Sequence, residues 1–180
     1  MSESALHPED LAAETIDTRT VAAIRKSVRV ATTVERAFAA FTEEVDSWWP
    51  RPHCINGSPM GRVVFERKIG GAIYSDQEGG TASRWGTLLD WDPPNRIVMA
   101  WQVSPLWLFE SDLAKCSEIE VTFRPIDDGL STLVELVHRA LEHHGDDDVE
   151  VCGASTVRFA SDPFRTSLSQ DRGGSMAIRA

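Results

Sequence analysis

The residue best suited to acid–base chemistry is His138, which ends the run TLVELVH at residues 132–138. Thr132, Val134, Leu136 and His138 occupy alternate positions, and such alternation places side chains on one face of a strand. Imidazole titrates near neutral pH, so a histidine facing an apolar interior can serve as an acid, a base or a polar contact for a ligand. A structural histidine whose hydrogen bonds are satisfied gives the same pattern and is the more frequent case.

Two other groups of reactive side chains have spacings that do not favour a site. His143 and His144 precede the acidic run Asp146–Asp148, and this order matches no known metal-ligand spacing, so we predict a solvated acidic turn and no metal. Cys54 directly follows His53, whereas a Cys/His pair is usually assembled from separate segments. With no GxGxxG, Walker, GxSxG or HExxH motif, the sequence predicts no catalytic residue and no cofactor.

Composition narrows the class of protein. The 180 residues are 42% hydrophobic and 26% charged, which is enough apolar material for the core of one domain. The net charge of −10 disfavours binding to nucleic acid or to an anionic membrane surface, because both need clustered Lys and Arg. Three scattered cysteines without a CxxC motif, and no signal or membrane-spanning segment, predict a reduced, cytoplasmic protein.

The order of predicted elements indicates an α+β fold. Residues 24–30 predict a first strand, and residues 34–49 have apolar side chains at helical spacing. About six short strands follow, including the strictly alternating run SEIEVTFRPI at 117–126, with a hairpin signal at residues 127–129. Short turns indicate an antiparallel sheet, and alternation with polar residues indicates one solvated face. The other face must be buried, and the expected partner is a C-terminal helix over residues 146–160.

Both ends of the chain are predicted to lie outside the domain. We expect a flexible N-terminal tail over residues 1–22, one domain over residues 23–162, and a disordered tail over residues 163–180. The C-terminal helix has an irregular pattern, because Gly153 and Pro163 interrupt it.

The tryptophans concentrate in the run WGTLLDWDPPNRIVMAW, at residues 85–101. The side chains expected to share a strand face are Trp85, Thr87, Leu89 and Trp91 on one strand, and Ile97, Met99 and Trp101 on the next. Pro93 and Pro94 set the corner between the strands. Core packing is the more frequent role of a single tryptophan, but a group on a curved sheet is expected to line a pocket in part. Of Trp48 and Trp49, at a helix end, we expect one in the core and one near the pocket mouth.

Several of these features together resemble a known family. They are the opening VRVATTVERAFAAFTEEVDSWWP, the glycine pair at 70–71, Gly86 before LLDWDPPNRIVMAW, and the strand TLVELVH that ends at His138. Over about residues 24 to 145 the chain resembles the domain related to activators of the heat-shock-protein-90 ATPase, within the START-like (SRPBCC) superfamily. The resemblance implies a helix-grip fold: a curved antiparallel sheet of about six to seven strands around a C-terminal helix, with a short helical segment after the first strand and a cavity between sheet and helix.

The resemblance implies three functions. The first is binding of a hydrophobic or aromatic small molecule in the cavity without catalysis. The residues expected to line that cavity are Trp49, Phe65, Tyr74, Trp85, Trp101, Phe123 and His138. The second is a co-chaperone that activates the heat-shock-protein-90 ATPase in a stress response. The third is an enzyme like the polyketide cyclases and hydrolases of the superfamily, with His138 as its acid or base. A homodimer is left open.

Overall fold

The computed structural model describes residues 22–49, 60–76, 82–104 and 106–144, together with Phe164 and Leu168. The helical elements are α1 (Val34–Thr42), α2 (Val45–Trp48) and three short 3-10 turns at Leu113–Lys115, Asp127–Gly129 and Leu141–His144. The strands are β1 (Ile24–Val30), β2 (Val63–Phe65), β3 (Ala72–Asp76), β4 (Ala82–Asp92), β5 (Arg96–Trp101), β6 (Ser117–Ile126) and β7 (Ser131–Arg139). No helix in these ranges is long and apolar enough to span a membrane.

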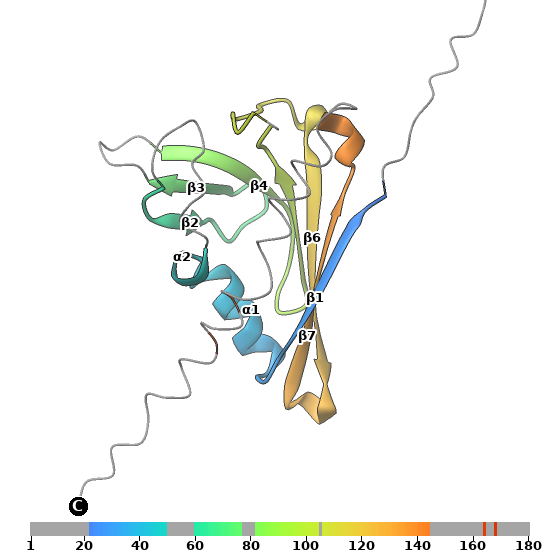
Figure 1. Ribbon diagram of the computed structural model, residues 1–180. Helices are drawn as coiled ribbons and strands as arrows, with labels where there is room; N and C mark the ends of the chain where they lie inside the picture. The colour runs from blue at the N-terminus through green and yellow to red at the C-terminus, as the bar shows by residue number, and fades with distance from the viewer. Residues whose placement is uncertain are drawn as a thin grey trace, which may run out of the picture.

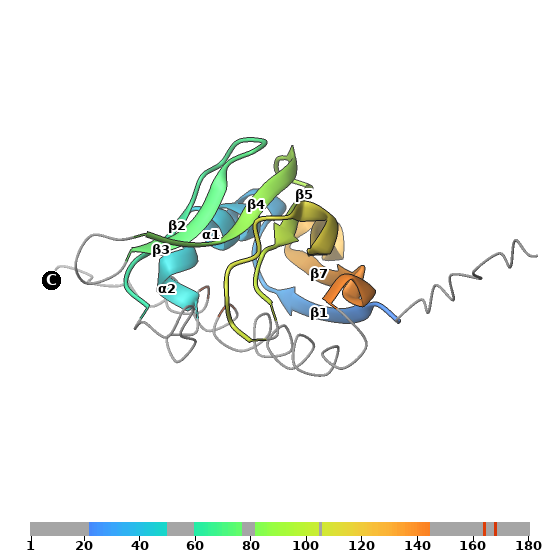
Figure 2. The same ribbon diagram turned by 90° about the horizontal axis from the view of Figure 1, so that it is seen from above.

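All seven strands form one antiparallel sheet in the order β1-β7-β6-β5-β4-β3-β2. The sheet curls, and α1 and α2 lie on the side toward which it curls (Figures 1 and 2). We call this side the inner face and the opposite side the outer face. The curled sheet confirms the predicted START-like, helix-grip class. The C-terminal helix predicted over residues 146–160 lies outside the described residues.

Helix α1 follows β1 directly and covers the inner face. Thr33 caps it by accepting a hydrogen bond from the backbone N–H of Arg36, at 3.4 Å, which satisfies one free donor of the first turn. Val34, Phe38 and Phe41 lie on one side of the helix and are all buried in the core. This apolar stripe packs α1 against the sheet through β6 and β7.

Two β-bulges in β4 overturn the predicted face of Thr87 and Leu89. The register shifts at Trp85, against β3, and at Leu89, against β5. A bulge adds one residue to a strand and interrupts the strict alternation of side chains. As a result Trp85 and Leu88 both enter the core, whereas Leu89 is only half-buried and Thr87 hydrogen-bonds to Gln102.

The predicted turns are present where glycine and aspartate indicated them. Gly70 has a φ of 77°, and a Cβ on Gly71 would lie 2.3 Å from the backbone oxygen of Glu66, so neither position suits a larger residue. Asp127, Asp128 and Gly129 all have positive φ and join β6 to β7. This tight hairpin sets the register that places Ile119 opposite His138.

Candidate functional site

Four of the seven predicted ligand-binding residues form a continuous row of rings on the inner face. The ring centroids of Trp49 and Trp85 are 4.2 Å apart, those of Trp85 and Trp101 5.7 Å, and those of Trp101 and His138 6.4 Å. All four side chains are buried, and they come from the end of α2, β4, β5 and β7. The structure therefore brings together residues that are 89 positions apart in the chain, from Trp49 to His138.

The other three predicted residues lie apart from this row. The ring of Phe123 packs 5.2 and 5.7 Å from two phenylalanines of α1, and the ring of Phe65 is 6.2 Å from that of Trp91. Tyr74 is half-buried and alternates along β3 with the fully buried Ile73, so it projects toward the outer face. The assignment of these seven residues to a ligand stays a prediction.

The polar group at the end of the row is a pair formed by His138 and Ser117. The Ser117 hydroxyl and Nε2 of His138 are 2.6 Å apart, and both side chains are completely buried. Their neighbours on the inner face, Trp101 and Ile119, are apolar. A hydroxyl and an imidazole in contact can exchange a proton, so the pair combines a donor with a base inside an apolar environment.

Sequence reasoning missed Ser117, although two signals point to it. The alternation of SEIEVTF places Ser117 on the same face as Ile119 and Val121. Counting back from the hairpin turn sets Ile119 opposite His138, and diagonal neighbours on paired strands are close enough for side-chain contact. The two signals together place Ser117 beside His138.

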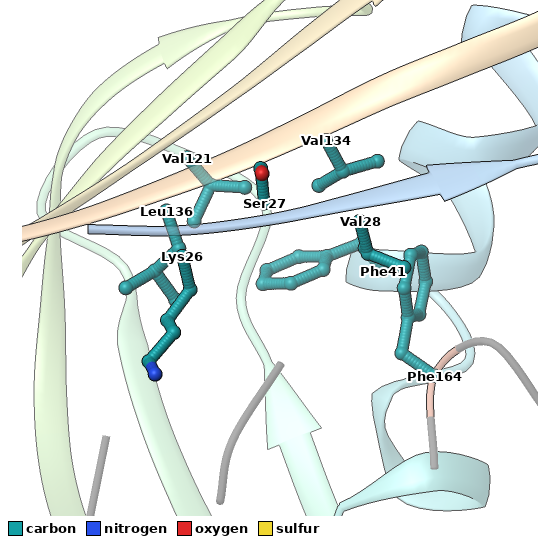
Figure 3. A pocket seen from close by; sticks show the side chains of 8 residues that line it. All are labelled: Lys26, Ser27, Val28, Phe41, Val121, Val134, Leu136 and Phe164. Carbon is teal, nitrogen blue, oxygen red and sulfur yellow. The ribbon is translucent and has the colours of Figure 1, made fainter. Parts of the chain in front are cut away.

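A cavity of about 160 Å³ lies between the inner face and α1. It is lined by Lys26, Ser27, Val28, Phe41, Val121, Val134, Leu136 and Phe164. Figure 3 shows Lys26 at one end and Phe164 at the other, with Val121, Val134 and Leu136 on the strands above. The seven predicted residues, all within the described part of the chain, are not among those that line it. Leu136 precedes His138 by two positions on β7, so the cavity and the Ser117–His138 pair occupy adjacent positions on one face.

Phe164 belongs to the range 163–180, for which the sequence predicts a tail. Its side chain is only 1% exposed, and its ring centroid lies 5.6 Å from that of Phe41 and 5.5 Å from that of Trp48. Phe164 thus closes one end of the cavity from a distant part of the sequence.

The outer face of β4–β7 carries a group of charged side chains. Arg96 donates to Glu120 at 2.7 Å and also pairs with Asp90, and Arg139 pairs with both Glu120 and Glu118. The hydrogen bond from Arg96 holds the pKa of Glu120 below its usual value, and the bond from Arg139 acts in the same direction. Each of these five charged groups thus lies within ion-pair distance of at least one group of opposite charge.

Two further side chains that could be reactive, Cys116 and His143, lie near the end of the sheet and contact other groups of the protein. Burial, followed by the nearby carboxylates of Glu110 and Asp112, raises the pKa of the Cys116 thiol to about 11, so the thiol stays neutral and unreactive near neutral pH. Nδ1 of His143 lies 2.9 Å from the backbone oxygen of Cys116. In the ranges that the structure describes, no three His, Cys, Asp or Glu side chains gather in a metal-binding arrangement, whereas residues 146–148 lie outside those ranges.

Residues 31–158 match the family described as activator of Hsp90 ATPase homolog 1-like protein. The chain belongs to this family. The match covers most of the 180 residues and confirms the resemblance found in the sequence. No curated protein matches the chain.

The fold of the chain is similar to those of several solved structures. An anthrahydroquino-γ-pyrone synthase, Txn09, is 37% identical, with a TM-score of 0.55, over 78% of this chain and 96% of the synthase chain. CalC, a self-sacrificing resistance protein from Micromonospora echinospora, is 24% identical, with a TM-score of 0.55, over 83% of this chain and 95% of its own. The Aha1 dimer from Colwellia psychrerythraea is 14% identical, with a TM-score of 0.52, over 82% of this chain and 93% of its own. At these lower identities, CalC and Aha1 show that the fold is shared and nothing further.

Proposed function

We propose that this protein binds a planar polycyclic aromatic molecule on the inner face of its sheet. The observation that carries the proposal is the 37% identity with a synthase whose name specifies an anthrahydroquinone-derived pyrone. The chemistry of the inner face fits such a molecule, because stacked indole rings and phenylalanines offer flat apolar contacts. Pockets for small molecules are typically apolar and aromatic with few polar groups.

The cavity sets how such a ligand lies. An engineered apolar cavity of about 150 Å³ holds one benzene, so the cavity of about 160 Å³ accommodates one ring of a larger system. For the remaining rings to reach the Ser117–His138 pair, which lies next to the cavity lining and is completely buried, neighbouring side chains have to move.

The polar anchor that we propose for the far end of the ligand is Trp85, which lies in the ring row of the inner face and not in the cavity lining. Its side chain is 1% exposed, and its indole Nε1 has no hydrogen-bond partner within the described residues. A buried donor without an acceptor costs about 1–3 kcal/mol. A quinone or pyrone carbonyl oxygen is a suitable acceptor, and it would orient a flat ligand whose faces offer no polar contacts.

Fluorescence quenching tests this function. Titration with anthraquinone-2-carboxamide should quench the tryptophan emission saturably at about micromolar ligand, and decanoate at the same concentration serves as an aliphatic control. Trp85→Phe should weaken the binding about threefold to tenfold, because one hydrogen bond is lost while the ring stack is kept. Linear quenching without saturation, equal to that of free tryptophan, contradicts the proposal.

A second candidate function is ring closure on the bound ligand, and the buried Ser117–His138 pair favours it. In forming a γ-pyrone, a substrate hydroxyl oxygen bonds to an unsaturated carbon of its own side chain as the π bond of that carbon breaks. The hydroxyl proton passes to Ser117 Oγ while the Ser117 proton passes to His138 Nε2. The imidazolium then returns a proton to the adjacent carbon, so the step needs no further reactant.

A suitable probe is 1-hydroxyanthraquinone with an alkynyl ketone at carbon 2, whose closure changes its visible absorption. Wild-type protein should accelerate closure, and His138→Gln should reduce the rate about 100-fold or more while leaving the affinity for the carboxamide within about twofold. If His138→Gln closes the ring as fast as wild type, the pair has only a structural role, and binding alone is the function.

A further inference from the structure

Of the described residues that line the cavity, Lys26 is the one that carries a positive charge. Lys26 lies on β1 directly opposite Leu136 of β7, and opposed residues of an antiparallel pair project from the same face. Lys26 therefore belongs to the inner face, although β1 is at the edge of the sheet and the residue is exposed. Its stem lines the cavity, and its ammonium group can stay in contact with water.

The neighbouring basic residues of β1 are placed differently. Arg25 lies opposite Val137 and projects from the outer face. Arg29, also on the outer face, pairs with Asp127. For Lys26, the part of the chain that the structure describes provides no hydrogen bond or ion pair. Among the described residues, one cation without a counter-ion thus lies at one end of a space that is otherwise almost entirely apolar (Figure 3).

We propose that Lys26 makes the cavity selective for an aromatic ligand that carries an anionic group, a carboxylate or an ionised phenol, on its terminal ring. This inference rests on the proposed function and adds the charge of the ligand to it. The ring occupies the space between Phe41 and the strands, and the anionic group reaches the ammonium at the cavity end. The net charge of −10 repels anions in general, so discrimination in favour of an anionic ligand has to come from a local cation.

Two ligands of nearly equal shape separate charge recognition from ring binding. Anthraquinone-2-carboxylate and anthraquinone-2-carboxamide differ in charge but present the same rings to the cavity. Wild-type protein should bind the carboxylate about fivefold more tightly, the size of a partly solvated ion pair. Lys26→Gln should abolish this preference, and Lys26→Glu should reverse it, so in both variants the affinity for the carboxylate changes more than the affinity for the carboxamide.

Arg25→Gln is the matched control, because it removes the same charge from the same strand but from the outer face. It should keep the full preference for the carboxylate. Equal binding of the two ligands by wild type, or an equal loss of preference in Lys26→Gln and Arg25→Gln, overturns the inference while the proposed function stands. In that case Lys26 only discourages edge-to-edge pairing of β1. Failure of wild type to bind either ligand overturns the proposed function itself.

Discussion

The two faces of strands β5–β7 differ in the contacts that their side chains make. On the inner face, Met99, Ile119 and Leu136 are almost fully buried in the apolar core, and the buried polar side chains Ser117 and His138 contact each other. On the outer face, Arg96 and Glu120 share a network of ion pairs in partial contact with water. Both faces belong to the same strands, so alternate residues of one segment meet opposite environments.

The two faces therefore contribute differently to the stability of the fold. Exposed ion pairs are each worth at most about 1 kcal/mol, because water screens the charges and side-chain entropy opposes them. Buried rings contribute more, since each removes a large apolar area from water. Stability is therefore concentrated on the inner face, where we also propose that the ligand binds, and the outer face mainly keeps the sheet solvated.

The largest expected effect comes from truncating a ring of the inner face. Phe123→Ala removes a side chain that is 2% exposed and packs against Phe38 and Phe41. We expect a loss of about 3–5 kcal/mol in the free energy of unfolding, from lost burial and from the cavity left behind. Urea unfolding followed by circular dichroism measures it.

The next residue along β6 provides the matched outer-face change. Arg124 is exposed and pairs with Glu135, so Arg124→Ala should cost less than about 1 kcal/mol. Comparable losses for Phe123→Ala and Arg124→Ala would erase the distinction between the faces.

An intermediate effect is expected at the polar pair. Ser117→Ala removes the hydroxyl that lies 2.6 Å from buried His138, and losing a buried hydrogen bond costs about 1–2 kcal/mol. The same urea titration tests this value, with the exposed Ser111→Ala as a control that should change nothing measurable. A stability equal to wild type would show that the pair contributes nothing to the inner face.

The smallest effect is expected in the outer-face network. Glu120→Gln keeps the shape but removes the charge that pairs with Arg96 and Arg139, and it should cost about 0.5–1 kcal/mol at pH 7. Because the pKa of Glu120 is lower in the folded protein than in the unfolded chain, its stabilisation is fully present above the ordinary glutamate pKa of about 4.3. It is lost as the pH falls through the lowered, folded-state pKa.

Unfolding free energies of wild type and Glu120→Gln at several pH values check this dependence. The difference should be constant near neutral pH, shrink below pH of about 4, and shrink with added salt at pH 7. A difference that grows on acidification would contradict the direction of the pKa shift. Glu118→Gln, which removes a contact with Arg139 alone, should show a smaller difference.

Prediction from sequence succeeded where the contacts are local. The alternation in β6 and β7 and the turn at Asp127–Gly129 correctly indicated which residues face inward, including His138. It was wrong for β4, because a bulge depends on how neighbouring strands pair. Thr87 and Leu89 left the predicted face for this reason, and Leu88 took a core position.

The sequence by itself determined the strand–helix–strand order, the antiparallel sheet and the apolar character of its inner face, because the spacing of side chains and turn residues encodes these properties locally. The curl of the sheet was implied only by the family resemblance. Only the tertiary structure decided that Lys26, Phe41 and Phe164 surround one cavity. Those residues come from distant segments, and their proximity depends on strand register and on packing between elements, which no local pattern specifies.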